Sequence, residues 1–381
     1  MRLLIIILLY LIPLCSSGKV IHQEQRRALW VVRYALSTKS AVDNIVSTAQ
    51  TLNINDIFVQ VRARGEALYD SRFEPVSALI QEPFDPLQYI IDQTRKTDIR
   101  IHAWVNMFYI WSGKKMPENG YHIINKKTDY VLRKDVFPDY QSLRAQGYEG
   151  FFLDPKIPQV QADLLNILKE LAVRYDISGI HLDYFRYPGL LYSFTPASRT
   201  LFMMEKLYDP WMLYYSPSHY SERYGYEVFL YADNEYRESL INAVTDYLQQ
   251  ISHTLKNINK ILEISVAVKP DPVQAKHRFF QDWLNWLEKK ICDFVVIMNY
   301  RTNFDEFEMI LKQLQTQQTM AMIVVGISTY NQNENAVIRR LRVVNAGDFS
   351  GYALFSYNHL YAHKNYLEKI RLEINGEGKN E

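Results

Sequence analysis

The chain has 381 residues, of which 48% are hydrophobic and 14% aromatic. Its 43 lysine and arginine residues almost balance 42 aspartate and glutamate residues, so it lacks the basic field that binding to a nucleic-acid backbone requires. We therefore expect no nucleic-acid partner. The length allows one large core, and single barrels of this size are common.

The first residues, MRLLIIILLYLIPLCSSG, follow the pattern of a secretory signal peptide. One arginine precedes an apolar run from Leu3 to Cys15 that is short for a membrane span. We expect a signal peptide over residues 1–18, a linker over 19–26, export to the periplasm or the medium, and no membrane span after cleavage. Lipid attachment at Cys15 is the alternative, which the bulky Leu14 disfavours. After cleavage Cys292 is the only cysteine, which excludes an intramolecular disulfide.

Eight short apolar segments alternate with amphipathic ones along the rest of the chain. Strands are predicted over residues 28–34, 56–62, 100–106, 179–184, 262–268, 293–299, 322–327 and 352–356. Helices are predicted over residues 40–52, 86–97, 160–175, 232–255, 280–289, 304–315 and 333–345. Because parallel strands need crossovers and eight strand-helix units close a barrel, we predict an α/β fold, a single (β/α)8 TIM barrel over residues 27–372.

The connections after strands three and four are long, over about residues 107–158 and 187–231. Long loops at the carboxyl ends of barrel strands usually build the binding cleft. Residues 373–381, beginning EINGEG, are predicted to form a flexible tail.

Polar residues at the strand ends are the candidates for chemistry, because they face the substrate in this fold. Strand four ends in GIHLDYFRYP, which places His181 and Asp183 on one face and Arg186 and Tyr187 just beyond. An aspartate inside a strand disfavours folding unless it is paired or has a function. We predict Asp183 to be the central acidic residue; pairing with Arg186 is the structural alternative.

Strand two continues into QVRARGEALYDS, which brings Arg62, Arg64 and Glu66 into one turn at the predicted mouth. Two arginines beside a carboxylate can hold it ionised or clamp an acidic group of a substrate. A structural network that fixes the loop is equally consistent with the sequence. The other predicted substrate-binding residues lie on or just after four strands: His102, Trp104, Asn106, Lys269, Asn299, Tyr300 and Tyr357.

Metal and serine-nucleophile chemistry have weak support in the sequence. His102, His181 and Asp183 could hold a metal, but the chain has no HxH or HExxH motif and no close cysteine pair. It also lacks the GxSxG turn of a serine hydrolase. We therefore predict no metal and no other cofactor.

Several segments together resemble the glycosyl hydrolase-like 10 family of bacterial barrels. The resemblance covers residues 28–361 and rests on VQVRARGEALYDSRFEP, IHAWVNMFYIWS, FLDPKIPQVQ, SGIHLDYFRYP, SVAVKPDP, QDWLNW, DFVVIMNY and GYALFSY, in this order. It implies hydrolysis of glycosidic bonds in a carbohydrate, and some similar proteins act on peptidoglycan glycan strands. The chain differs from many members at two positions. It has Ser178 where they have Asp, and its GEA motif has Glu66 where their GDA motif has Asp.

Glycoside hydrolysis usually uses two carboxyl groups, one protonated and one ionised. We expect Asp183 and Glu66 in these roles, with Asp154 and Asp70 as reserves, or an N-acetyl group of the substrate in place of a protein nucleophile. A retaining and an inverting mechanism both stay open. The alternatives are a barrel that binds glycan without cleaving it and a metal-dependent amidohydrolase or deacetylase, for which His102 and His181 would be ligands.

Overall fold

A computed structural model describes residues 25–113, 115–132, 149–317 and 319–377. The expected signal peptide, its cleavage site and Cys15 lie outside these residues. Within them, no helix is both long and apolar enough to cross a membrane.

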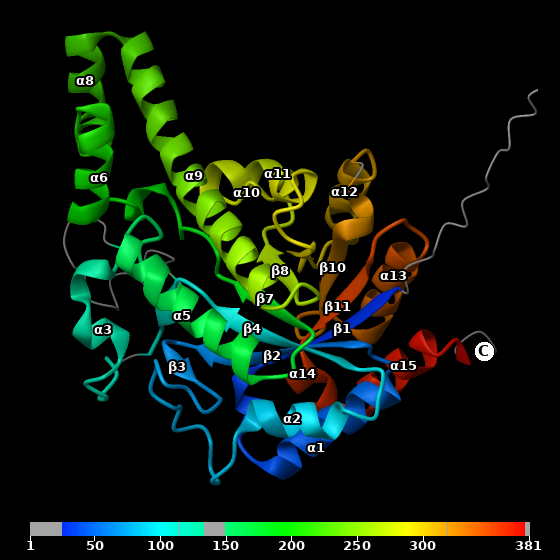
Figure 1. The fold of residues 1–381 in the computed structure, drawn as a ribbon. Coiled ribbons are helices and arrows are strands. Elements are labelled where there is room, and N and C mark those ends of the chain that lie inside the picture. Colours follow the sequence, from blue (N-terminus) through cyan, green and yellow to red (C-terminus); the bar gives the residue numbers. More distant parts are fainter. Residues whose placement is uncertain (1–24, 114, 133–148, 318, 378–381) are drawn as a thin grey trace, which may run out of the picture.

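Eight parallel strands form a closed barrel at the centre of the molecule (Figure 1). Neighbouring strands follow the order β1-β11-β10-β9-β8-β7-β4-β2, and β2 pairs with β1 to close the ring. Their bounds are β1 (Arg26–Val31), β2 (Asp56–Ala63), β4 (Arg100–Asn106), β7 (Gly179–Asp183), β8 (Glu263–Val268), β9 (Phe294–Met298), β10 (Ile323–Ser328) and β11 (Gly351–Phe355). The predicted (β/α)8 TIM barrel and its eight strands are confirmed.

Almost every strand residue is buried, as expected for a parallel sheet that helices cover. The helices that surround the barrel are α1 (Lys39–Thr51), α2 (Pro86–Thr94), α5 (Pro158–Arg174), α9 (Tyr226–Ile258), α10 (Pro272–Phe279), α11 (Trp283–Glu288), α12 (Phe304–Leu314), α13 (Glu334–Asn345), α14 (Tyr357–Ala362) and α15 (Lys364–Ile374). Several begin at a side-chain cap: Thr38 accepts a hydrogen bond from the backbone N–H of Ala41, and Asp85 accepts one from Gln88.

The long connection after β4 contains α3 (Ile123–Lys126) and a two-stranded sheet of β5 (Tyr109–Trp111) and β6 (Phe151–Phe152). The connection after β7 contains α6 (Pro196–Lys206), α7 (Trp211–Tyr215) and α8 (Pro217–Tyr224). These three helices were not predicted individually. With the N-terminal part of α9 they form an arm that projects from the barrel (Figure 1).

Helix α9 has 33 residues and is therefore about 50 Å long. Its buried positions begin at Ala232, the residue at which the sequence predicts the helix to start. The preceding turns belong to the projecting arm, so the apolar pattern marks only the part that packs on the barrel.

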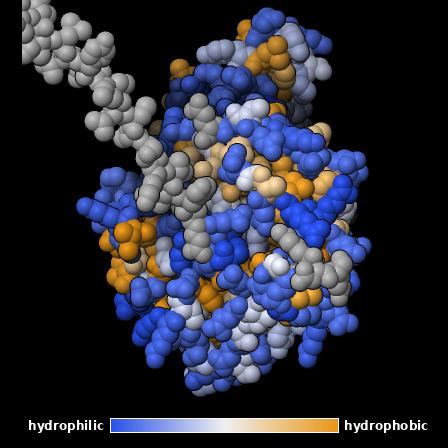
Figure 2. Space-filling model, turned by 90° about the vertical axis from the view of Figure 1, so that its right-hand side faces the viewer, coloured by the Kyte–Doolittle hydropathy of each residue, from blue (hydrophilic) through white to orange (hydrophobic). Residues whose placement is uncertain are grey.

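The C-terminal helix α15 ends at Ile374 and so includes the first two residues of the predicted tail, 373 and 374. The ion pair between Glu373 and Arg342, with 2.6 Å between Oε2 and Nη2, holds this last turn against α13. The face shown in Figure 2 is mainly hydrophilic, and its hydrophobic side chains gather in small separate patches.

Candidate active site at the barrel mouth

A cavity of about 450 Å³ opens at the carboxyl ends of the barrel strands. Residues at or just after the ends of β1, β4, β7, β8, β9 and β11 line it: Val32, Asn106, Asp183, Lys269, Met298 and Phe355. This is the end of a TIM barrel at which active sites are found.

Asp183 is the last residue of β7 and lies beside Asn106 of β4 in the sheet register. Its Oδ2 accepts a hydrogen bond from the indole N–H of Trp104 at 3.1 Å, and its Oδ1 accepts one from the backbone N–H of Tyr184 at 2.6 Å. Burial raises the pKa of Asp183 to about 6, although Tyr184, Arg186 and Trp104 favour the ionised form. This carboxyl group therefore keeps its proton in weakly acidic solution.

Glu149 is the second carboxyl group among the described residues that line the cavity. It lies two residues before β6, and its Oε2 accepts a hydrogen bond from Nη2 of the buried Arg186 at 2.5 Å. Burial alone would raise the pKa of Glu149, but the charges of Arg186 and Lys269 outweigh it, and the pKa lies below the ordinary value. The two carboxyl groups thus have pKa values shifted in opposite directions.

Aromatic side chains form two walls of the cavity. On one wall the rings of Tyr300 and Phe355 stack at 5.4 Å between centroids, and Trp30 meets the edge of Phe355 at 5.8 Å. On the other wall Tyr109 and Tyr184 stack at 4.4 Å. Flat apolar faces with polar edges are suited to contact with sugar rings.

Six of the predicted site residues come together around this cavity: Trp104, Asn106, Asp183, Arg186, Lys269 and Tyr300. The Oδ1 atom of Asn106 accepts a hydrogen bond from the Gln60 amide at 3.3 Å. The remaining predicted residues lie elsewhere.

Glu66, the expected second carboxylate, does not line the cavity. It belongs to β3 (Glu66–Ala67), which runs antiparallel to the end of β2 and carries the chain back from the mouth. Its Oε2 accepts a hydrogen bond from the Ser77 hydroxyl at 2.9 Å. The reserve Asp70 is exposed and pairs with Arg174, whereas the reserve Asp154 is buried and accepts a hydrogen bond from Thr195.

Arg62 and Arg64, at the end of β2 and just after it, also have local partners. Arg62 is fully buried, where its guanidinium pairs with Glu74 and donates to the backbone carbonyls of Asn106 and Met107. Arg64 has a left-handed backbone, with φ of 57°, and its guanidinium lies 5.6 Å from the Trp111 ring. Arg62 therefore holds the loop after β4 in place. This is the structural role that the sequence left open as the alternative to binding a substrate.

The histidines lie below the mouth. His102 is the third residue of β4 and its Nε2 is 2.7 Å from Asp56, the first residue of β2. His181 is fully buried; its Nε2 accepts from the Trp30 indole at 3.1 Å, so Nδ1 carries the proton that faces Ser265 at 2.9 Å. Burial and the charge of His102 lower the pKa of His181 well below its ordinary value.

His102, Asp56 and Glu263 form a group whose ligand atoms lie within 4.8 Å of one another. The guanidinium of Arg26 pairs with both carboxylates, so this group already contains a cation. It lies at the amino ends of the strands, away from Asp183.

Three further predicted residues are buried beside the barrel. The Tyr187 hydroxyl lies 3.4 Å from Asp154, the Asn299 amide donates to the backbone of Phe307, and Tyr357 begins α14. None of the three lines the mouth cavity.

Sequence reasoning missed Glu149, Arg33 and most of the aromatic walls. Glu149 precedes the apolar FFL segment within a long connection, and that short run was the one signal for a strand returning over the mouth. Trp30 lies within a predicted strand, but alternation alone does not show how far along the barrel a side chain lies.

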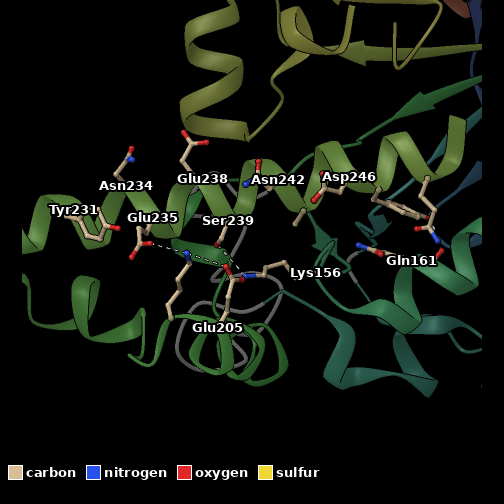
Figure 3. A pocket seen from close by; sticks show the side chains of 14 residues that line it. Lys156, Gln161, Glu205, Tyr231, Asn234, Glu235, Glu238, Ser239, Asn242 and Asp246 are labelled. Carbon is tan, nitrogen blue, oxygen red and sulfur yellow. Dashed lines mark hydrogen bonds and ion pairs between the residues drawn. The ribbon is translucent and has the colours of Figure 1, made fainter. Parts of the chain in front are cut away.

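A larger hollow of about 720 Å³ lies on the outside of the barrel, along one face of α9 (Figure 3). Lys206 pairs there with Glu235 at 3.0 Å, and the Lys156 ammonium lies 3.4 Å from the Ser239 hydroxyl. The hollow contains none of the predicted site residues.

Solved structures of glycoside hydrolases share this fold. The glycoside hydrolase domain of PgaB (BpsB) from Bordetella bronchiseptica superposes with a TM-score of 0.69 and 12% identity, covering 92% of this chain and 99% of that domain. An alpha-L-fucosidase from Paenibacillus thiaminolyticus gives a TM-score of 0.64 and 11% identity, over 92% of this chain and 49% of that one. At these identities the likeness concerns the fold alone: the chain is a TIM barrel, and these glycoside hydrolases share that fold.

The family is narrower than this fold class. The model of the glycosyl hydrolase-like 10 family matches residues 25–340, and the chain belongs to this family. Glycosyl hydrolase DigH of Escherichia coli K12 is 25% identical over 327 residues, which cover 78% of this chain and 67% of DigH. Glycosyl hydrolase YngK of Bacillus subtilis 168 is 26% identical over 168 residues, which cover 42% of this chain and 31% of YngK.

Proposed function

We propose that the protein hydrolyses glycosidic bonds in a polysaccharide, with peptidoglycan glycan strands as the substrate. The observation that carries the proposal is the pair of carboxyl groups in one open cavity, Asp183 with a raised pKa and Glu149 with a lowered one. Two carboxyl groups with opposite protonation states are the usual machinery of this reaction.

In this mechanism Asp183 is the general acid. Its protonated carboxyl donates to the glycosidic oxygen as the bond to the anomeric carbon breaks, and the oxygen of a water molecule then bonds to that carbon, directly in an inverting mechanism or after a covalent intermediate in a retaining one. The donors on its two oxygens, Trp104 and Tyr184, fix the direction of the carboxyl group and then stabilise the carboxylate that remains.

Glu149 is the ionised carboxylate of the pair, because Arg186 stabilises its negative charge. A carboxylate beside the reacting sugar stabilises the positive charge of the oxocarbenium-like transition state. The stacked rings of Tyr109 and Tyr184 and of Tyr300 and Phe355 provide surfaces for the sugars on either side.

The experiment is an assay of reducing ends released from purified peptidoglycan strands and from other polysaccharides. Wild type is expected to release sugars, and Asp183→Asn to be slower by a factor of about 10² to 10⁴, the usual contribution of a general acid. Binding of the same strands by both proteins checks that the variant is folded. Strands that bind to both proteins and are cleaved by neither would establish a glycan-binding barrel and contradict the proposal.

We also propose that the chain is exported. The support is the sequence of residues 1–18 alone. Mass spectrometry of the mature N-terminus tests it: cleavage near residue 18 supports a signal peptide, a lipidated Cys15 supports an anchor, and an intact Met1 in the cytoplasm contradicts export.

A further inference from the structure

Three cationic side chains surround one phenylalanine ring at the edge of the mouth cavity. The charged groups of Arg186, Lys269 and Arg278 lie 5.1, 4.9 and 5.2 Å from the centroid of the Phe279 ring, at the end of α10. We refer to these three residues as the basic cluster. Arg186 and Lys269 line the cavity itself.

The basic cluster has more positive charge than its neighbours neutralise. Glu149 pairs with Arg186, but neither the Lys269 ammonium nor the Arg278 guanidinium has an ion pair or hydrogen bond to any described part of the chain. Burial, then Arg186 and Arg278, lower the pKa of Lys269, while Glu149 and Asp183 oppose this. Contact with the Phe279 ring offsets only a small part of the repulsion.

Lys269 lines the cavity, and Arg278 lies beside it, against the same Phe279 ring. Lys269 follows the end of β8 and is half-buried, whereas Arg278 on α10 is exposed. Unneutralised like charges at the wall of a cleft attract anions and raise their local concentration. Arg33 lines the same cavity, so three cationic side chains, with Arg186 and Lys269, face the two carboxyl groups of Asp183 and Glu149 there.

We propose that the basic cluster binds a carboxylate carried by the glycan, so that the site selects acidic polysaccharides over neutral ones. This inference rests on the proposed function, because it assumes that the occupant of the cavity is a glycan. A carboxylate on the sugar next to the cleaved bond would take Lys269 and Arg278 as partners, since Glu149 already occupies Arg186. The carboxylate could belong to a uronic acid or to a lactyl ether on an amino sugar.

The test measures binding to the Asp183→Asn protein, which keeps substrates intact. The probes are peptide-free peptidoglycan strands, which carry lactyl carboxylates, and hyaluronan oligomers, which carry uronic acids. Each is compared with the same material after conversion of its carboxylates to methyl amides. We expect at least one acid to bind about tenfold more tightly than its amide, the effect of a charge-assisted hydrogen bond, and the acid that does so identifies the source.

Substitutions then locate the effect. Lys269→Gln and Arg278→Gln are each expected to remove most of the preference for the acid, measured in each variant as the ratio of the affinities for acid and amide. Matched controls are Lys156→Gln, whose ammonium lies 5.3 Å from the Phe202 ring, and Arg339→Gln, whose guanidinium lies 3.5 Å from the Phe304 ring, both outside the cavity. These should keep the preference.

Equal affinity for acid and amide, or a preference that survives the Lys269→Gln and Arg278→Gln double variant, would overturn the inference. Hydrolysis of glycan by wild type without any such preference would leave the proposed function intact and remove only this inference. The two failures are therefore distinguishable.

Discussion

The two ends of the barrel each contain a buried aspartate, and their surroundings differ. Asp56, at the amino end of β2, lies 3.3 Å from Arg26, 2.7 Å from Arg100 and 2.7 Å from His102. Asp183, at the carboxyl end of β7, has two neutral donors and no ion pair to a described residue. The hydrogen bond with His102 and the charges of Arg26 and Arg100 lower the pKa of Asp56 to about 2 despite its burial, whereas burial raises the pKa of Asp183 to about 6.

The comparison separates a structural from a chemical use of the same side chain. A buried carboxylate that pairs with arginines is ionised in the folded state and holds strands together. A buried carboxyl group without such partners can gain and lose a proton near neutral pH.

Asp56→Asn should destabilise the fold and leave the geometry of the mouth cavity unchanged. Removing this member of a buried ionic network takes a carboxylate partner from Arg26, Arg100 and His102, and such changes cost about 3 to 5 kcal/mol. The free energy of unfolding in urea measures this. Asp70→Asn is the control, because Asp70 pairs with Arg174 on the surface, and its loss should cost less than about 1 kcal/mol. Equal losses of unfolding free energy in the two variants would contradict the structural role of Asp56.

The stability difference between Asp183→Asn and wild type should depend on pH. The pKa of Asp183 is raised from 3.8 to about 6 on folding, so the folded protein binds more protons between these values and wild type loses stability as pH rises through them. Between pH 4 and pH 8 the difference should therefore move in favour of the variant, by up to about 3 kcal/mol. Denaturant unfolding at the two pH values provides the measurement, and a difference independent of pH contradicts the raised pKa.

Trp104→Phe should move the alkaline limb of the pH profile of kcat/KM. The indole N–H donates to Oδ2 of Asp183 and favours its ionised form, so its removal raises the pKa of the acid. The limb, expected near pH 6 in wild type, should move up by about one pH unit. Trp211→Phe, in the projecting arm, is the control and should leave the limb in place. A limb that stays or moves down after Trp104→Phe means that this hydrogen bond does not tune Asp183.

The sequence predicted the barrel well because each strand is a separate apolar run between polar turns. It also placed Asp183 correctly, because a residue that ends a parallel strand must lie at the mouth. The depth of side chains inside the barrel was harder to predict. His102 and Asn106 share one face of β4, but four residues of strand separate them by about 13 Å, and only Asn106 reaches the cavity.

The positions of residues outside the strands were also hard to predict from the sequence. Glu66 follows β2 by three residues, yet the antiparallel turn into β3 takes it away from the cavity. Glu149 is distant in sequence from every barrel strand end, and the pairing of β5 with β6 brings its segment over the mouth. Such placement depends on tertiary packing of a long connection, which local periodicity does not record.

The central claim is that Asp183 works with Glu149 across one cavity. The most direct measurement compares kcat/KM for glycan hydrolysis in two matched variants, Glu149→Gln and Glu66→Gln, which remove one carboxylate each. We predict a loss of about 10²-fold or more for Glu149→Gln and a change of less than about threefold for Glu66→Gln, with both proteins folded by circular dichroism. Full activity in Glu149→Gln together with a large loss in Glu66→Gln would contradict the account.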